Sequence, residues 1–217
     1  MMKQYVIHID NGHGAHEYMR PSDGKHSPDN RLYEGDWNRD IARRLQEALR
    51  DIGYDARLVV PEDIDVPLQT RCNRVNEAVK KEPEFSHIFI SIHINAAPSA
   101  HCDKQGWYDS ASGVTVYVSK NASESSKRLA QALYTGVKKF HLEGNRSIPP
   151  EQYLTANFKV LSGTVCPAVL TESLFMTNHA EVDFLLSEQG KETIVNLHLL
   201  GILHYLGHPA SVIVQPQ

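Results

Sequence analysis

The apolar positions of this chain fall into short, nearly unbroken runs of strand length. Residues 5–10 read Tyr-Val-Ile-His-Ile-Asp and end at Asn11-Gly12, a pattern typical of a buried strand that opens into a turn. Apolar runs without polar alternation indicate strands covered on both faces, as in a parallel sheet. The predicted strands cover residues 5–10, 54–60, 87–93, 114–118, a stretch near 158–161, and 168–173.

Between these runs, apolar residues recur every three or four positions, which predicts amphipathic helices. Trp37, Ile41 and Leu45 follow this spacing, and Gly53 supplies a stop. The predicted helices cover residues 37–52, 68–81, 124–140 and 191–206. Strands that alternate with helices predict an α/β fold: a single domain with a mostly parallel, twisted sheet and helices on both faces. We expect this domain to span residues 1–208, followed by a loose C-terminal tail at 209–217.

Two long polar segments show neither the apolar runs of strands nor the three- to four-residue spacing of helices, and are predicted to be loops. Residues 14–33 and 95–112 are rich in small and polar residues, and loops of such length are often functional. The first contains His16 and His26, which could compete as metal ligands but are expected to be solvated. The second contains Trp107, which could stack on a sugar ring or anchor its loop to the core. The sequence leaves both uses of Trp107 open.

The charge balance disfavours two classes of partner. The chain has 217 residues, of which 22 are Lys or Arg and 26 are Asp or Glu, so its formal net charge is −4. We expect no nucleic-acid partner, because such proteins present a basic surface. Stable membrane insertion is not expected either, because no apolar run approaches the roughly 20 residues that span a bilayer.

The cysteines and the N-terminus bear on where the protein works. Cys72, Cys102 and Cys166 are far apart and odd in number, so free thiols are expected. The first residues lead directly into a strand, without the charged and hydrophobic regions of an export signal. This pattern fits a protein that stays in the cytoplasm until it is released, or a sequence that has already been processed.

Three candidate metal ligands lie where strands end or a helix begins. His13 follows the first strand, Glu34 stands at the start of the first helix, and His93 closes the third strand. Residues at the carboxyl ends of parallel strands can converge from distant points of the chain, and catalytic zinc uses two His and one carboxylate. Their spacing matches no compact helical motif. Structural roles for the histidines and a favourable helix-start position for Glu34 therefore remain open.

Four blocks of sequence, taken in order, resemble a known family. The blocks are Ile9-Asp10-Asn11-Gly12-His13-Gly14, then Glu34 at the start of a helix, then Ile90-Ser91-Ile92-His93-Ile94-Asn95-Ala96, and finally Pro167-Ala168-Val169-Leu170-Thr171-Glu172-Ser173. Together they resemble the zinc amidases of the N-acetylmuramoyl-L-alanine amidase type 3 family, over roughly residues 4–206. The chain departs from the usual family pattern at Asn11, where Pro is common, and at Ala15, where a second Gly is common.

The resemblance implies a role for each candidate residue. It makes His13, Glu34 and His93 the ligands of one Zn2+ per chain, and Glu172 the catalytic carboxylate. Glu172 follows the apolar residues 168–170 and could be a partly solvated acid at a strand end. The resemblance favours a general base that takes a proton from water and returns it to the leaving amine.

The implied function is zinc-dependent hydrolysis of the amide bond between N-acetylmuramic acid and L-alanine in peptidoglycan. The site of action would be the bacterial cell wall, periplasmic or extracellular, and we expect a monomer; a regulatory protein partner is left open. One alternative is another zinc peptidase acting on cell-wall peptides, although no Arg is placed convincingly to hold a substrate carboxylate. The other is a non-catalytic cell-wall binding module, which the presence of all four chemical positions disfavours.

Overall fold

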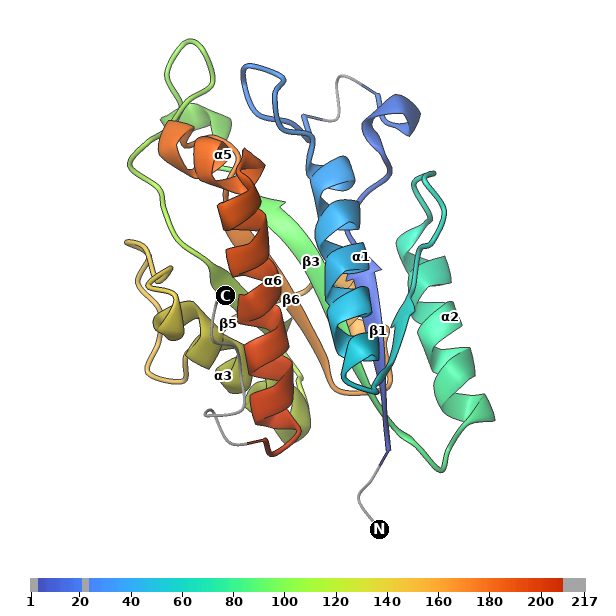
Figure 1. Cartoon of the computed structure of the whole chain (residues 1–217). Coiled ribbons are helices and arrows are strands. Elements are labelled where there is room, and N and C mark those ends of the chain that lie inside the picture. Colours follow the sequence, from blue (N-terminus) through green and yellow to red (C-terminus); the bar gives the residue numbers. More distant parts are fainter. Residues whose placement is uncertain (1–3, 21–23, 209–217) are drawn as a thin grey trace.

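The computed structural model describes residues 4–20 and 24–208, and these form a six-stranded sheet between layers of helices (Figure 1). The strand order is β2-β1-β3-β6-β4-β5. The strands are β1 Tyr5–Asn11, β2 Asp55–Leu58, β3 Ser86–Asn95, β4 Thr115–Ser119, β5 Leu154–Ala156 and β6 Ala168–Phe175. Neighbouring strands run parallel except β4 and β6, which are antiparallel. The predicted α/β fold with a mostly parallel sheet is confirmed.

Helices cover both faces of the sheet, as predicted. The helices α1 (Glu34–Asp51), α3 (Glu124–Lys139) and α6 (Glu188–Tyr205) pack over one face, and α1 and α6 lie side by side in Figure 1. The other face carries α2 (Leu68–Lys81) and the short α4 (Lys159–Ser162).

Strand alternation divides the apolar side chains between these two layers. Ile7 and Ile9 of β1 belong to the core cluster under α1 and α6, whereas Phe89 of β3 and Leu170 of β6 belong to the cluster under α2. Burial of these side chains is the main driving force for this layered arrangement. Residues two apart in a strand share a face, so Asp10 lies on the same side of β1 as His8. This side faces α2, where Asp10 pairs with Arg71.

One predicted strand is wrong. The stretch near residues 158–161 enters α4, and the strand of this region is β5, a few residues earlier. Four residues are too few for hydrophobic periodicity to distinguish a strand from a helix. In the structure Leu161 and Ser162 both donate backbone hydrogen bonds to the carbonyl of Phe158, which closes a helical turn.

The structure also contains a helix that was not predicted, α5 (His179–Leu186). Its first turn is capped by Asn178, whose side chain accepts a hydrogen bond from the N–H of Glu181 at 3.1 Å. Within this helix, Val182 and Leu185 are buried. The strand predicted at 54–60 is shorter in the structure, where it is β2 (Asp55–Leu58). Each of the two predicted loops contains a short 3-10 helix: η1 (His16–Tyr18) and η3 (Ser99–His101). The tail predicted at 209–217 lies outside the described residues.

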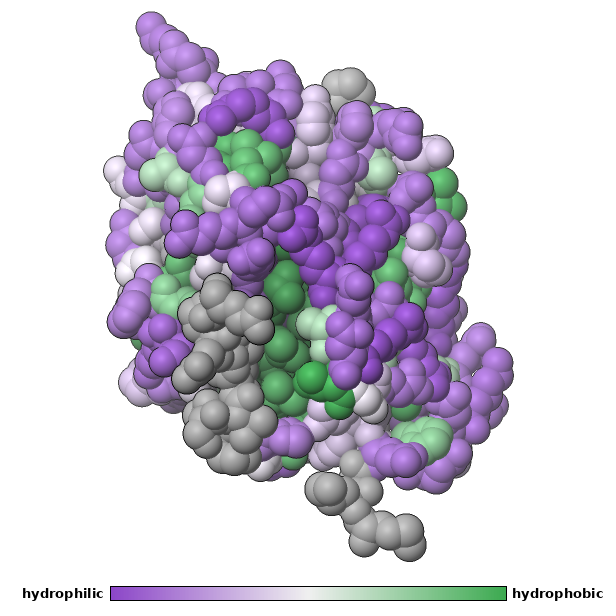
Figure 2. Space-filling view, viewed as in Figure 1, coloured by the Kyte–Doolittle hydropathy of each residue, from purple (hydrophilic) through white to green (hydrophobic). Residues whose placement is uncertain are grey.

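The surface of the face shown in Figure 2 is mainly hydrophilic, with an apolar strip between α1 and α6. Within residues 4–20 and 24–208, no helix is both long and apolar enough to cross a membrane. Cys72, Cys102 and Cys166 are free thiols, as expected.

Candidate active site

The turn that follows β1 presents His13 at the carboxyl edge of the sheet. Its backbone is left-handed, with φ 64°, a region that residues other than glycine adopt infrequently. Gly12 allows the ring of His93 to lie against the turn, because a Cβ atom at position 12 would be 2.2 Å from Cε1 of that ring. The His13 and His93 rings meet edge to face, with their centroids 5.0 Å apart.

Glu34 begins α1 and is 2% exposed. Its Oε1 accepts a hydrogen bond from the backbone N–H of Ile94 at 3.1 Å and lies 3.1 Å from Nδ1 of His93. Its Oε2 lies 3.3 Å from Nε2 of His13 and 4.0 Å from Nζ of Lys25. Burial opposes ionisation, but the close contacts with His13 and His93 and their positive charge hold the pKa of Glu34 well below its usual range. The carboxylate is therefore charged at neutral pH.

These three side chains form a group that fits a divalent metal ion. One ligand atom from each of His13, Glu34 and His93 lies within 4.8 Å of the other two. In a tetrahedral zinc site with bonds of about 2 Å, neighbouring ligand atoms are roughly 3.3 Å apart. Here Nε2 of His13 lies 3.3 Å from Oε2 of Glu34, and Nδ1 of His93 lies 3.1 Å from Oε1 of the same carboxylate. Oε2 of Glu34 is buried and makes no hydrogen bond to the described residues. A buried carboxylate with one oxygen beside each of two imidazoles is a donor set suited to zinc.

Glu172 stands beside this group. It is the register partner of His93 across β3 and β6, so both side chains leave the sheet on the same face. Its Oε2 is buried and lacks a hydrogen-bond partner among the described residues. Burial raises the pKa of Glu172 to about 7, and the charge of Glu34 acts in the same direction. A carboxyl group that titrates near neutral pH can both accept and return a proton.

The two histidines of the long loop do not join the candidate ligands. Nδ1 of His16 pairs with the carboxylate of Asp36. Nδ1 of His26 hydrogen-bonds the carbonyl oxygen of Ser27 at 2.9 Å. Both rings lie beside Tyr33, with centroid distances of 4.5 and 5.8 Å. His16 and His26 instead line a separate pocket with Tyr33.

Trp107 has contacts that anchor its loop. Its ring is partly buried against the larger core cluster and stacks on His179, with the centroids 3.7 Å apart. The backbone N–H of Trp107 donates to Oδ1 of Asp103 at 2.8 Å, and the carbonyl of Trp107 accepts a hydrogen bond from the N–H of Asp103. These contacts match the anchoring role, one of the two uses that the sequence left open.

Two features of the site were not predicted from sequence. Lys25 lies close to the Glu34 carboxylate, and its position in a polar loop gave no signal of this. Gly35 allows the start of α1 to meet the turn after β1, because an added Cβ atom there would lie 1.8 Å from the carbonyl oxygen of Gly14. Such close approaches join elements that are distant in sequence.

Comparison with known proteins adds independent information. A family model described as N-acetylmuramoyl-L-alanine amidase matches residues 7–204. The chain is 24% identical over 201 residues to the endolysin of Bacillus phage SPP1, covering 93% of this chain and 66% of the endolysin. It is 31% identical over 181 residues to the N-acetylmuramoyl-L-alanine amidase LytC of Bacillus subtilis, covering 83% of this chain and 31% of LytC.

Solved structures share the fold of this chain. The crystal structure of N-acetylmuramoyl-L-alanine amidase from Clostridium difficile 630 superposes with a TM-score of 0.73 and 26% sequence identity, covering 94% of this chain and 97% of that one. The amidase Ami1 from Mycobacterium smegmatis shares the fold, with a TM-score of 0.75, 18% identity, and coverage of 95% and 98% of the two chains. Since the family model spans nearly the whole described chain, this protein belongs to the N-acetylmuramoyl-L-alanine amidase family.

Proposed function

We propose that this chain is a zinc-dependent hydrolase that cleaves the amide bond between N-acetylmuramic acid and L-alanine in peptidoglycan. The observation that carries the proposal is the convergence of His13, Glu34 and His93 beside Glu172, in a member of this family. We further propose that the protein acts on the bacterial cell wall, with one zinc ion per chain.

In this proposal, His13, Glu34 and His93 would hold the metal ion. When bound there, zinc supplies a positive charge that polarises an amide carbonyl and makes a nearby water molecule more acidic. The chain presents two imidazoles and one ionised carboxylate, a set of three protein ligands that catalytic zinc sites use. The hydrogen bond from the N–H of Ile94 to Glu34 orients the carboxylate within this set.

Glu172 would move the proton. Its carboxylate accepts a proton from the attacking water, whose oxygen forms a bond to the lactyl carbonyl carbon of the muramic acid. The bond from that carbon to nitrogen then breaks, and Glu172 delivers the proton to the amine of L-alanine. The burial that raises its pKa to about 7 suits both halves of this exchange.

The test is an analysis of what the protein releases from purified peptidoglycan. We expect stem peptides with a free N-terminal L-alanine, identified by mass spectrometry, and glycan strands without attached peptide. A chelator should stop the release and added zinc should restore it.

Other products would support different activities. Shortened stem peptides that remain attached to glycan would identify a peptidase of the cell wall. Binding to peptidoglycan without any release would identify a non-catalytic wall-binding module. Either outcome contradicts the amidase proposal.

A further inference from the structure

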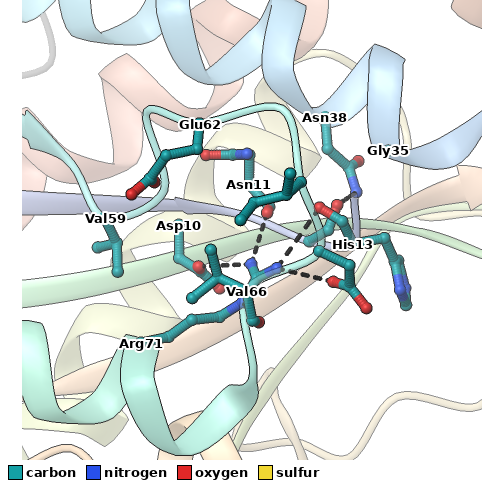
Figure 3. Close-up of polar contacts among 12 residues, drawn as sticks. Asp10, Asn11, His13, Gly35, Asn38, Val59, Glu62, Val66 and Arg71 are labelled. Carbon is teal, nitrogen blue, oxygen red and sulfur yellow. Dashed lines mark hydrogen bonds and ion pairs between the residues drawn. The ribbon is translucent and has the colours of Figure 1, made fainter. Parts of the chain in front are cut away.

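The three successive carbonyl oxygens of residues 11–13 each accept a hydrogen bond from a buried side chain of α1 or α2. Nη1 of Arg71 donates to the first at 2.7 Å, and Nδ2 of Asn38 donates to the second at 3.1 Å. Nη1 of Arg39 donates to the third, that of His13, at 2.9 Å. Nη2 of Arg71 also reaches this third oxygen at 3.4 Å, as Figure 3 shows. The turn that carries a candidate metal ligand is therefore held at every residue.

Arg71 is a buried cation paired with a buried anion, Asp10, and with the more exposed Asp65. It is 1% exposed, and its Nη1 lies 2.9 Å from Oδ1 of Asp10, which is also 1% exposed (Figure 3). The second oxygen of Asp10 accepts a hydrogen bond from the hydroxyl of Ser91 at 2.6 Å, and Nε of Arg71 donates to the carbonyl of Val66 at 2.8 Å. Buried charges persist when they are paired and fully hydrogen-bonded. This pair fastens β1, three residues before His13, to α2.

Arg39 reaches the same turn from α1. It is 4% exposed, and its Nη1 also donates to the carbonyl of Gly35 at 3.0 Å. Its Nη2 donates to the carbonyls of Glu62 and Ile64 at 3.1 and 3.3 Å. Arg39 therefore couples the His13 carbonyl to the helix that begins at Glu34, a second candidate ligand.

We propose that Arg71 and Arg39 are positioning residues that hold His13 in its left-handed conformation and so preset the metal site before the ion binds. This inference rests on the proposed function, because it requires the metal at His13, Glu34 and His93. A left-handed backbone is unfavourable for histidine, and donors that converge on its carbonyl oxygen offset this strain. Both arginines act through the His13 backbone, as groups around metal sites do when they orient a ligand.

The test compares lysine substitutions that retain the charge but remove the planar fork of donors. The two test variants are Arg71→Lys and Arg39→Lys. Their controls are Arg74→Lys and Arg43→Lys. Arg74 lies one turn further along α2 and donates to the carbonyl of Val59 and the carboxylate of Glu62. Arg43 lies one turn further along α1 and pairs with Asp63.

Two quantities are measured for each protein: the zinc dissociation constant, by competition with a chromogenic chelator, and the free energy of unfolding in excess chelator. We expect the zinc dissociation constant to rise about 10- to 100-fold in Arg71→Lys and Arg39→Lys. The two controls should bind zinc as the wild type does. If Arg71→Lys does not fold, Arg39→Lys provides the test by the same criterion. In the wild type, the guanidinium of Arg39 donates to the His13 carbonyl, as that of Arg71 does.

Two results would overturn the inference, and they can be told apart from failure of the proposed function. Unchanged zinc affinity in both test variants, even with reduced stability of the metal-free protein, would make the arginines purely structural. An equal loss of zinc affinity in the controls would show that the effect does not depend on the hydrogen bonds to the turn at residues 11–13. Wild-type protein that binds no zinc would instead contradict the proposed metal centre itself.

Discussion

His93 and Glu172 are direct neighbours across the sheet, because β3 and β6 pair these two residues in register. A candidate metal ligand and the candidate proton carrier are thus fixed by strand pairing rather than by a loop. The register shifts only beyond this pair, between His93 and Asn95. Their relative position should therefore be insensitive to movement of the long loops around the site.

Replacing Glu172 by Gln keeps the shape of the side chain but removes its basicity. We expect kcat for stem-peptide release to fall about 10²- to 10⁴-fold, the usual contribution of a general acid–base group. The zinc content should not change, because Glu172 is not among the three candidate ligands. Steady-state release from soluble peptidoglycan fragments measures the rate.

A suitable control is Glu181→Gln. Burial also raises the pKa of Glu181, to about 6, but its carboxylate accepts hydrogen bonds from the N–H groups of Gly113 and Phe175 instead of facing the site. This variant should keep most of its activity. Equal losses in the two variants would argue against a chemical role for Glu172.

A methyl group at position 12 should disturb the site without a polar change. In Gly12→Ala the new carbon would overlap the ring of His93, so this ring must move. We expect zinc affinity to fall about 10-fold or more. Gly53→Ala is the comparison, because a Cβ atom there meets no atom within 4 Å; its positive φ should cost stability and leave zinc affinity intact. Wild-type affinity in Gly12→Ala would contradict the close packing of Gly12 on His93.

The fold should weaken in acid because His198 is buried as a neutral ring. Burial lowers the pKa of His198 to about 4. Between pH of about 6.5 and 4, the unfolded chain binds a proton that the folded chain excludes, so the free energy of unfolding falls as the pH falls. The full effect is about 3 kcal/mol and levels off below pH of about 4.

Urea unfolding across this pH range measures the effect. The free energy of unfolding should change less steeply with pH in His198→Gln than in the wild type, whatever the absolute stability of the variant. His8, whose pKa burial also lowers to about 4, contributes to the slope in both proteins, so the difference isolates His198. Identical slopes would contradict a buried neutral histidine at position 198.

Zinc should stabilise the folded chain, because its three ligands come together only on folding. At a free zinc concentration about 100 times the dissociation constant, the gain in unfolding free energy is about 2.7 kcal/mol. Glu172→Gln should show the same gain, and His13→Ala should show little of it. Thermal unfolding with and without chelator provides the comparison.

The layered fold was predictable because its signals are local. The run at residues 87–93 is mostly apolar, and the periodic spacing in α1 exceeds four turns, so both patterns are clear. The misassigned stretch near 158–161 is too short for either period to develop. The unpredicted α5 had a usable signal, since the spacing of Asn178 and Glu181 is that of a capping box.

The residues of the candidate site could be proposed from the sequence, but their geometry could not. His13, Glu34 and His93 were candidates from their places at strand ends and at a helix start. Their separations carry no metal-ligand pattern, so the roles of these residues and of Glu172 came from the resemblance. Nothing in the sequence marked Arg71, since an arginine on an amphipathic helix ordinarily belongs to the solvated face. Its burial follows from the position of Asp10 on β1, which only the three-dimensional packing reveals.

The most direct test of the metal-dependent amidase combines zinc content by mass spectrometry with stem-peptide release, on the wild type, His93→Ala and Glu172→Ala. We predict one zinc per chain and release of peptides for the wild type, loss of both for His93→Ala, and retained zinc without release for Glu172→Ala. Peptide release by zinc-free wild type, or full activity in Glu172→Ala, would contradict the account.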